Sequence, residues 1–311
     1  MMIFQPLILK SFTLSAFPLR AIPFPSWLHD TAIDLPGPLA IKWYGIAYIV
    51  SLFGAYFYAR RSCANRALWQ AENPVGEAIV PDKRMLEDLL FFSFLGIILG
   101  GRIGYILLYG LDKYLAHPLD IFKVWEGGMS FHGGFAGVCL AALYMAKTRK
   151  IRLMRIADIL AISAPIGLFL VRLANFVNQE LYGRETDVPW AVIFKPGGRL
   201  LAPRHPSQLY EAFLEGIVIF SVLFIASRKG KILTKPGQAT GLFMLMYGTF
   251  RFLIEFVREP DAIAQFDPLT RGQVYSLPMI VFGVIVLVWA RRQKPVAPRW
   301  PESEAGSDAD A

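Results

Sequence analysis

Charged and hydrogen-bonding side chains lie inside strongly apolar stretches of this sequence, and their types suit recognition of a phosphate. They are Arg102, His132, Arg172 with Asn175, and Arg251 with Glu255. An ionised side chain near the bilayer centre costs at least ~2.5 kcal/mol, so such residues by default mark a pathway or an active site facing the interior of a bundle. Guanidinium groups offer fork-shaped pairs of donors that match the oxygens of a phosphodiester.

The spacing of these residues places several of them on common helix faces. Tyr247, Arg251 and Glu255 are four residues apart, and Arg172 and Asn175 are three apart, so each set stacks on one face of a helix. An ion pair within the helix, between Arg251 and Glu255, would neutralise both charges and is an alternative, purely structural role. That role does not explain why a second arginine, Arg172, lies at the same depth as Arg251.

His132 has two possible roles. A histidine has a reference pKa of ~6.5 and can accept a proton at neutral pH, but a lone membrane histidine more often joins helices through a hydrogen bond. Two glycines follow it and allow a ligand or another backbone to approach. A hydrolytic pair of Ser130 with His132 is disfavoured, because residues two apart on a helix face different directions.

The elements that must position these residues are membrane helices. The 311 residues are 55% hydrophobic and 18% charged, whereas about a quarter of the residues of a soluble domain are charged. The net charge of +8 is concentrated in loops between apolar segments, so no nucleic-acid partner is expected. Cys63 and Cys139 provide neither a disulfide framework nor a metal site. We therefore predict an all-α integral membrane protein.

Seven segments approach the ~20 apolar residues needed to span a bilayer. They are residues 41–59, 89–109, 129–146, 156–177, 207–226, 241–256 and 274–290. These segments predict a bundle of seven transmembrane helices within a membrane domain of residues 36–293. Residues 1–35 are expected to form an irregular or interfacial extension, and residues 294–311, rich in Pro, Ser, Glu and Asp, a disordered cytoplasmic tail.

Lysine and arginine gather in the loops after the first, third, fifth and seventh segments, and the longer loop after the fourth segment, with Arg184, Lys195, Arg199 and Arg204, is the exception. Positive loops remain cytoplasmic, so the N-terminus is predicted outside and the C-terminus in the cytoplasm. With this orientation, Tyr44, His132, Arg172 and Arg251 all fall in the outer half of the membrane. That agreement in depth predicts a cavity open to the outer leaflet.

Five blocks of sequence, in order along the chain, resemble the bacterial prolipoprotein diacylglyceryl transferase family. They lie at residues 100–105, 125–134, 172–180, 204–211 and 251–261. The resemblance implies transfer of the diacylglyceryl group of phosphatidylglycerol to the lipobox cysteine of a prolipoprotein signal peptide, with release of glycerol phosphate. It also implies the bacterial cytoplasmic (inner) membrane as the location, an active site toward the outer leaflet, and neither cofactor nor metal.

This chemistry assigns roles to the residues identified above. Arg172 and Arg251 would stabilise the departing phosphate. His132 is the candidate base for the thiol, whose reference pKa is ~8.5, and Tyr44 shares or replaces that role. The expected substrate-binding residues are Arg172, Asn175, Glu180, Gly183, Tyr247 and Glu255.

A lipid or lipid-linked-sugar transporter is the alternative function, because the same arginines would bind a phosphate head group without breaking a bond. Transport requires polar residues in the inner half of the membrane as well. Asp158 is the clear candidate there.

Overall fold

The computed structural model describes residues 21–34, 40–123, 127–259 and 269–301, and these residues are mostly helical. The principal helices are α1 (Trp43–Ala64), α2 (Lys83–Tyr109), α4 (Phe131–Thr148), α5 (Leu153–Val177), α6 (Ser207–Glu211), the π-helix η6 (Ala212–Val218), α7 (Ile219–Arg228), α8 (Gln238–Ile254) and α9 (Arg271–Arg292). Shorter helical segments are α3 (Leu111–Ala116), η2 (Arg66–Leu68), η3 (Pro118–Phe122), η5 (Pro196–Gly198) and η7 (Ile232–Thr234).

Each of the seven apolar segments contains a long helix, with α6, η6 and α7 forming one continuous run. Within the described part of the chain, four helices are long and apolar enough to cross a bilayer: α2, α5, Ser207–Arg228 and α9. Helices α4 and α8 are shorter, at 18 and 17 residues. The protein is therefore an α-helical integral membrane protein.

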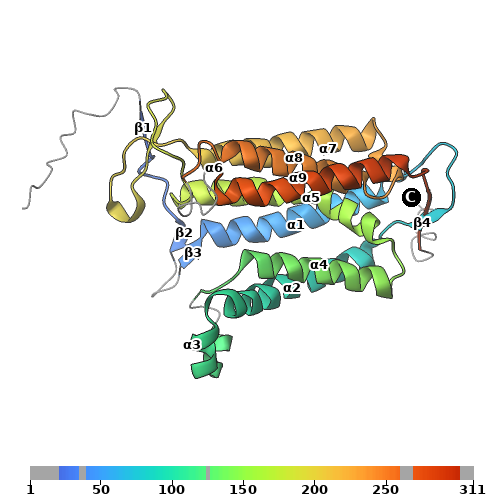
Figure 1. Cartoon of the computed structure of the whole chain (residues 1–311), viewed down its shortest axis with the longest axis horizontal. Coiled ribbons are helices and arrows are strands. Elements are labelled where there is room, and N and C mark those ends of the chain that lie inside the picture. Colours follow the sequence, from blue (N-terminus) through green and yellow to red (C-terminus); the bar gives the residue numbers. More distant parts are fainter. Residues whose placement is uncertain (1–20, 35–39, 124–126, 260–268, 302–311) are drawn as a thin grey trace, which may run out of the picture.

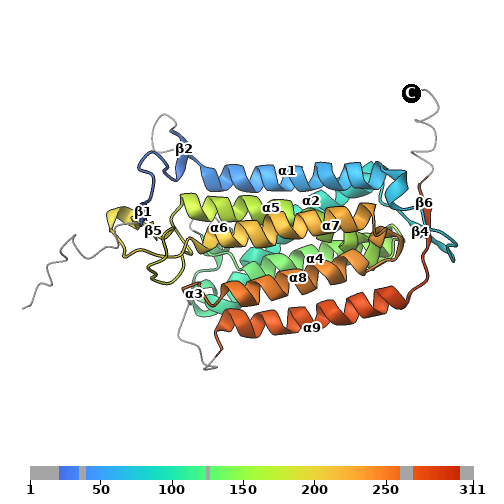
Figure 2. The same ribbon diagram turned by 90° about the horizontal axis from the view of Figure 1, so that it is seen from above.

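The helices run side by side along the long axis of the molecule (Figures 1 and 2). Helix α1 packs against α5, α8 against α9, and α2 against α4. One end of the bundle carries α3, β1 (Ile22–Pro23) and β2 (Thr31–Asp34), and the opposite end carries β4 (Glu77–Ile79) (Figure 1). We call these the α3 end and the β4 end.

Small residues bring α2 and α4 unusually close together. A Cβ atom added to Gly100 would lie 2.4 Å from the Gly133 carbonyl oxygen, and one added to Gly96 would lie 2.5 Å from that of Gly137. Larger residues would force the two backbones apart. The glycines of the first sequence block thus serve helix packing.

Short strands close both ends of the bundle. At the α3 end, β1 (Ile22–Pro23) pairs in parallel with β5 (Val192–Ile193), and β2 (Thr31–Asp34) pairs antiparallel with β3 (Ala40–Lys42). The extension predicted for residues 1–35 thus contains strands in its described part, and residues 1–20 lie outside the described residues.

The tail differs from the expected disorder over its first residues. Strand β6 (Ala297–Arg299) pairs in parallel with β4 (Glu77–Ile79) at the β4 end. Two apolar residues account for this order: Val296 is buried, and the Trp300 ring lies 5.1 Å from the Arg66 guanidinium. The many polar residues of this tail led to the expectation of disorder, despite Val296 and Trp300. Residues 302–311 lie outside the described part of the chain.

Candidate active site at the α3 end

The alternating directions of the helices bring the predicted site residues to the α3 end (Figure 2). Tyr44 lies in the first turn of α1 and His132 in the first turn of α4. Arg172 and Asn175 lie in the last turns of α5, and Arg251 lies in the last turn of α8. The common depth expected from the sequence is therefore present in the fold.

Arg172 contacts two glutamates that the sequence reading did not include in the site. Its Nε atom lies 3.2 Å from Glu211 Oε2, and its Nη2 atom donates to Glu215 Oε2 over 3.1 Å. Both glutamate side chains are 0% exposed, whereas the Arg172 side chain is 14% exposed. A buried carboxylate needs a partner of opposite charge, and Arg172 supplies it for both.

A sequence signal for these two glutamates existed. Glu211 and Glu215 are four residues apart in an apolar helix, the same spacing as Arg251 and Glu255. Glu211 is the last residue of the block at 204–211, and Glu215 lies just beyond it. The segment that carries Glu215 is the π-helix η6, a form of helix that occurs frequently at functional sites.

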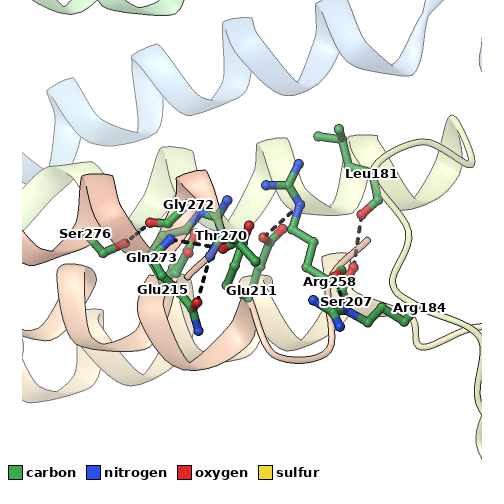
Figure 3. Close-up of polar contacts among 12 residues, drawn as sticks. Leu181, Arg184, Ser207, Glu211, Glu215, Arg258, Thr270, Gly272, Gln273 and Ser276 are labelled. Atoms are coloured by element: carbon green, nitrogen blue, oxygen red, sulfur yellow. Dashed lines mark hydrogen bonds and ion pairs between the residues drawn. The ribbon is translucent and has the colours of Figure 1, made fainter. Parts of the chain in front are cut away.

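Arg251 donates a hydrogen bond to Glu255 one turn further along, so the predicted intrahelical ion pair is present. Glu211 also lies 4.0 Å from the Arg258 guanidinium, and Figure 3 shows this pair beside the start of α9. The position of Glu255 depends on Gly272, because a Cβ there would lie 2.5 Å from the Glu255 carboxyl carbon.

We refer to these six residues as the arginine–glutamate cluster: Arg172, Arg251, Arg258, Glu211, Glu215 and Glu255. Three positive and three negative groups balance when all are ionised. Tyr247 borders the cluster and interacts electrostatically with Arg172 and Arg251. The side chains of these two arginines are 14% and 15% exposed, more than those of their carboxylate partners. The accessible part of the cluster is therefore cationic.

A second polar group adjoins this cluster. Asn175 Nδ2 donates to the Tyr44 hydroxyl over 3.1 Å and to Glu180 Oε1 over 2.7 Å. Gln208 Nε2 in turn donates to the Glu180 backbone carbonyl over 2.6 Å. Tyr44, Asn175 and Glu180 are thus brought together as predicted for neighbouring site residues, and Arg172 lies one turn earlier on the same helix as Asn175.

Gly183 connects two loops through a β-bridge with Arg258. Its N–H donates to the His205 carbonyl over 2.8 Å, and a Cβ here would lie 2.5 Å from the Val257 carbonyl oxygen. Arg204 donates to the Gly183 carbonyl over 3.1 Å and to Glu259 over 2.7 Å. Gly183 therefore contributes close backbone packing. Burial lowers the pKa of the His205 imidazole, which favours its neutral form.

His132 is not part of either hydrogen-bonded group in the described part of the chain. It is exposed, and it forms no hydrogen bond with the residues that the structure describes. Its ring centre lies 6.4 Å from that of Tyr275 in the first turn of α9. Ser130 caps α4 by accepting from Gly133 N–H over 3.3 Å, so the hydrolytic pairing of Ser130 with His132 is not formed.

Arg102 has a structural role in this fold. Its guanidinium donates to the backbone carbonyls of Asp120 and Gly127, each over 2.6 Å, and of Ile121 over 2.8 Å. These carbonyls belong to the loop region that follows α2. Arg102 therefore orders this loop and does not belong to the arginine–glutamate cluster.

Asp158, the polar residue of the inner half, caps a helix. Its carboxylate accepts from the Gly237 N–H over 2.7 Å and from the Thr240 hydroxyl over 2.8 Å, at the start of α8. The side chain is fully buried. The Asp158 carboxylate satisfies the first N–H groups of α8, and this capping role accounts for its presence. The transporter alternative therefore loses its candidate for an inner polar site.

Comparison with known proteins adds independent information. Residues 30–289 match the family model of prolipoprotein diacylglyceryl transferase. The chain is similar to phosphatidylglycerol–prolipoprotein diacylglyceryl transferases of Rhodospirillum rubrum (47% identity, 90% of this chain and 98% of the relative) and Mesorhizobium japonicum (45%, 91% and 97%). It is also similar to that of Geobacter sulfurreducens, at 48% identity over 83% of this chain and 94% of the relative.

Proposed function

The chain belongs to the prolipoprotein diacylglyceryl transferase family, and we propose that the arginine–glutamate cluster is where it acts on its lipid. The enzyme transfers the diacylglyceryl group of phosphatidylglycerol to a prolipoprotein. The acceptor is the lipobox cysteine of the signal peptide, and the product is a thioether. The observation that carries the assignment of the site is a pair of partly exposed arginine side chains, Arg172 and Arg251, whose glutamate partners are only 0% to 4% exposed.

The reaction exchanges one bond for another at the lipid glycerol. The thiol loses its proton to a base. The sulfur then attacks the carbon of the diacylglyceryl group that is bonded to the phosphate oxygen. The carbon–oxygen bond breaks, and its electron pair leaves with the phosphate as glycerol phosphate. Negative charge therefore shifts toward the phosphate oxygens, where Arg172 and Arg251 stabilise it.

The remaining site residues orient these groups. Glu255 holds the Arg251 guanidinium through their ion pair, and Tyr247 borders both arginines. Asn175 and Glu180 fix the hydroxyl of Tyr44 beside the same helix end. Gly183 lets the two loops pack closely against each other. The locations of these residues support roles for them in substrate binding.

The thiol proton has two candidate acceptors. His132 is exposed at the first turn of α4, where a peptide can reach it without disturbing the buried network. Tyr44 lies nearer the cluster, because Asn175 connects it to the helix of Arg172. We propose His132 as the base, with Tyr44 as a participant in proton transfer or lipid orientation.

We further propose that all seven helical segments cross the bacterial cytoplasmic membrane, with the α3 end toward the outer leaflet. The basic loops support this orientation: Lys147, Arg149 and Lys150 follow the outward-to-inward helix α4 at the β4 end. A reporter fused within residues 147–155 should be cytoplasmic, and one inserted within 185–203 should be periplasmic. The reverse pattern would contradict the orientation and the assigned depth of the site.

The function is tested by incubating the purified protein with phosphatidylglycerol and a peptide that carries a lipobox. Mass spectrometry should show the addition of one diacylglyceryl unit to the cysteine. A peptide with serine in place of the cysteine is the matched control and should stay unmodified. Movement of lipid between vesicles without a modified peptide would support the transporter and overturn the proposal.

A further inference from the structure

The Arg172 guanidinium is held along only one of its edges. Glu215 Oε2 accepts from both Nε and Nη2, over 3.3 and 3.1 Å, and Glu211 Oε2 lies 3.2 Å from Nε. No described residue forms a hydrogen bond with Nη1. The carboxylates therefore occupy the edge formed by Nε and Nη2 and leave the outer edge, with Nη1, for another partner.

Burial indicates the direction in which this outer edge faces. The Glu211 and Glu215 side chains are 0% exposed, and the Arg172 side chain retains 14% exposure. The accessible part of Arg172 must therefore lie away from the glutamates. A planar guanidinium rotates as a unit, so fixing one edge also fixes the direction of the other.

Glu215 is better placed than Glu211 to set this orientation. Its Oε2 atom bridges two nitrogens of Arg172, whereas Glu211 is shared between Arg172 and Arg258. Figure 3 shows Glu211 directed toward Arg258. Glu215 thus constrains the rotation of the guanidinium plane more strongly.

The backbone around Glu215 is fitted closely to the helix of Arg172. Glu215 lies in the π-helix η6, and its neighbour Gly216 packs against α5. A Cβ on Gly216 would lie 2.6 Å from the Phe169 Cβ and 2.9 Å from its Cα. The absence of that side chain lets η6 approach α5 and places the Glu215 carboxylate within hydrogen-bonding distance of Arg172.

We propose that Glu215 is a positioning residue, which binds the inner edge of Arg172 and so directs its outer edge toward the lipid phosphate. This inference rests on the proposed function. What matters in this role is an acceptor oxygen at the correct reach, because a misdirected guanidinium loses its geometric match to the phosphate. The negative charge of Glu215 is secondary.

Three substitutions separate reach from charge. Glu215→Gln keeps the length and an acceptor oxygen but removes the charge, and it should retain kcat/KM for phosphatidylglycerol within about threefold. Glu215→Asp keeps the charge but is one methylene shorter, and it should lose at least about tenfold, as should Glu215→Ala. Each rate is divided by the amount of folded protein, and the melting temperature is measured in parallel.

The matched control is Ser227→Ala, a buried polar position further along the same helical run, which should behave as wild type. Activity in Glu215→Asp equal to or above that of Glu215→Gln would overturn the positioning role, whether or not the alanine variant folds. Failure of the wild-type protein to modify the peptide at all would instead overturn the proposed function. The two failures are thus distinguishable.

Discussion

Asn175 and Tyr44 lie 131 residues apart in the sequence and are joined by a hydrogen bond of 3.1 Å from the amide Nδ2 to the phenol oxygen. The same amide donates to Glu180 Oε1 over 2.7 Å. The bond connects the first turn of α1 to the last turn of α5. Asn175 therefore fixes Tyr44 beside the helix that also carries Arg172. We expect Tyr44 and Asn175 to act as one unit in the reaction.

This unit predicts non-additive effects of mutation. Tyr44→Phe and Asn175→Ala should each lower kcat/KM by about tenfold, and the double variant should lose little more than the worse single variant, because residues of one network couple. The measurement is a double-mutant cycle on folded protein. Tyr58→Phe, further along α1, is the control. Fully multiplicative losses would contradict the coupling.

The two accessible arginines should not tolerate lysine. Arg172→Lys keeps a positive charge but loses the planar fork that engages both glutamates and the phosphate, so transfer should fall at least about tenfold, or ~1.4 kcal/mol of transition-state stabilisation. Arg251→Lys should behave similarly, and Arg228→Lys in an exposed turn of α7 is the control. Full activity of both variants at normal protein levels would show that neither arginine clamps a phosphate.

His132 is tested by the pH dependence of transfer. The side chain is exposed and forms no hydrogen bond with described residues, so His132→Asn should have little effect on the melting temperature. If His132 is the base, transfer at neutral pH should drop, and it should recover in part toward pH ~8.5, where the thiolate forms without help. Rates per folded protein across about pH 6 to 9 provide the measurement. An unchanged profile with normal activity would assign the proton to Tyr44 or to a lipid group.

Gly272 gives a prediction about the Arg251–Glu255 pair. In Gly272→Ala, the new methyl group would lie 2.5 Å from the Glu255 carboxyl, which must then move away from its position beside Arg251. We expect the free energy of unfolding to fall by about 1–3 kcal/mol, the usual cost of overpacking, and the rate of diacylglyceryl transfer to fall markedly. Gly45→Ala in α1 meets no atom within 4 Å and is the control. Equal activity in both variants would show that Glu255 does not depend on this contact.

The sequence was sufficient to predict that the protein is helical and that its polar residues gather at one end of the bundle. Apolar length located the seven segments, and four-residue spacing identified the pair of Arg251 with Glu255, which the structure contains. The roles of the individual site residues stay predictions.

Other features depend on contacts between distant segments, which spacing alone does not determine. Glu215 meets Arg172 because η6 packs against α5, and no local pattern connects residues on two different helices. Arg102 resembled a site residue by composition and depth, yet nearby carbonyls occupy its guanidinium. The ordered residues 294–301 depend on a strand pairing with β4, more than 200 residues earlier in the chain.

The central claim is that this protein breaks the bond between the diacylglycerol and the phosphate and joins the lipid to a thiol in one coupled reaction. Its most direct test is to quantify glycerol phosphate and diacylglyceryl peptide together, with purified protein, phosphatidylglycerol and a lipobox peptide. We predict equal molar amounts of the two products, and neither product with a peptide whose cysteine is replaced by serine. Glycerol phosphate released without a modified peptide, or neither product from folded wild-type protein, would contradict the account.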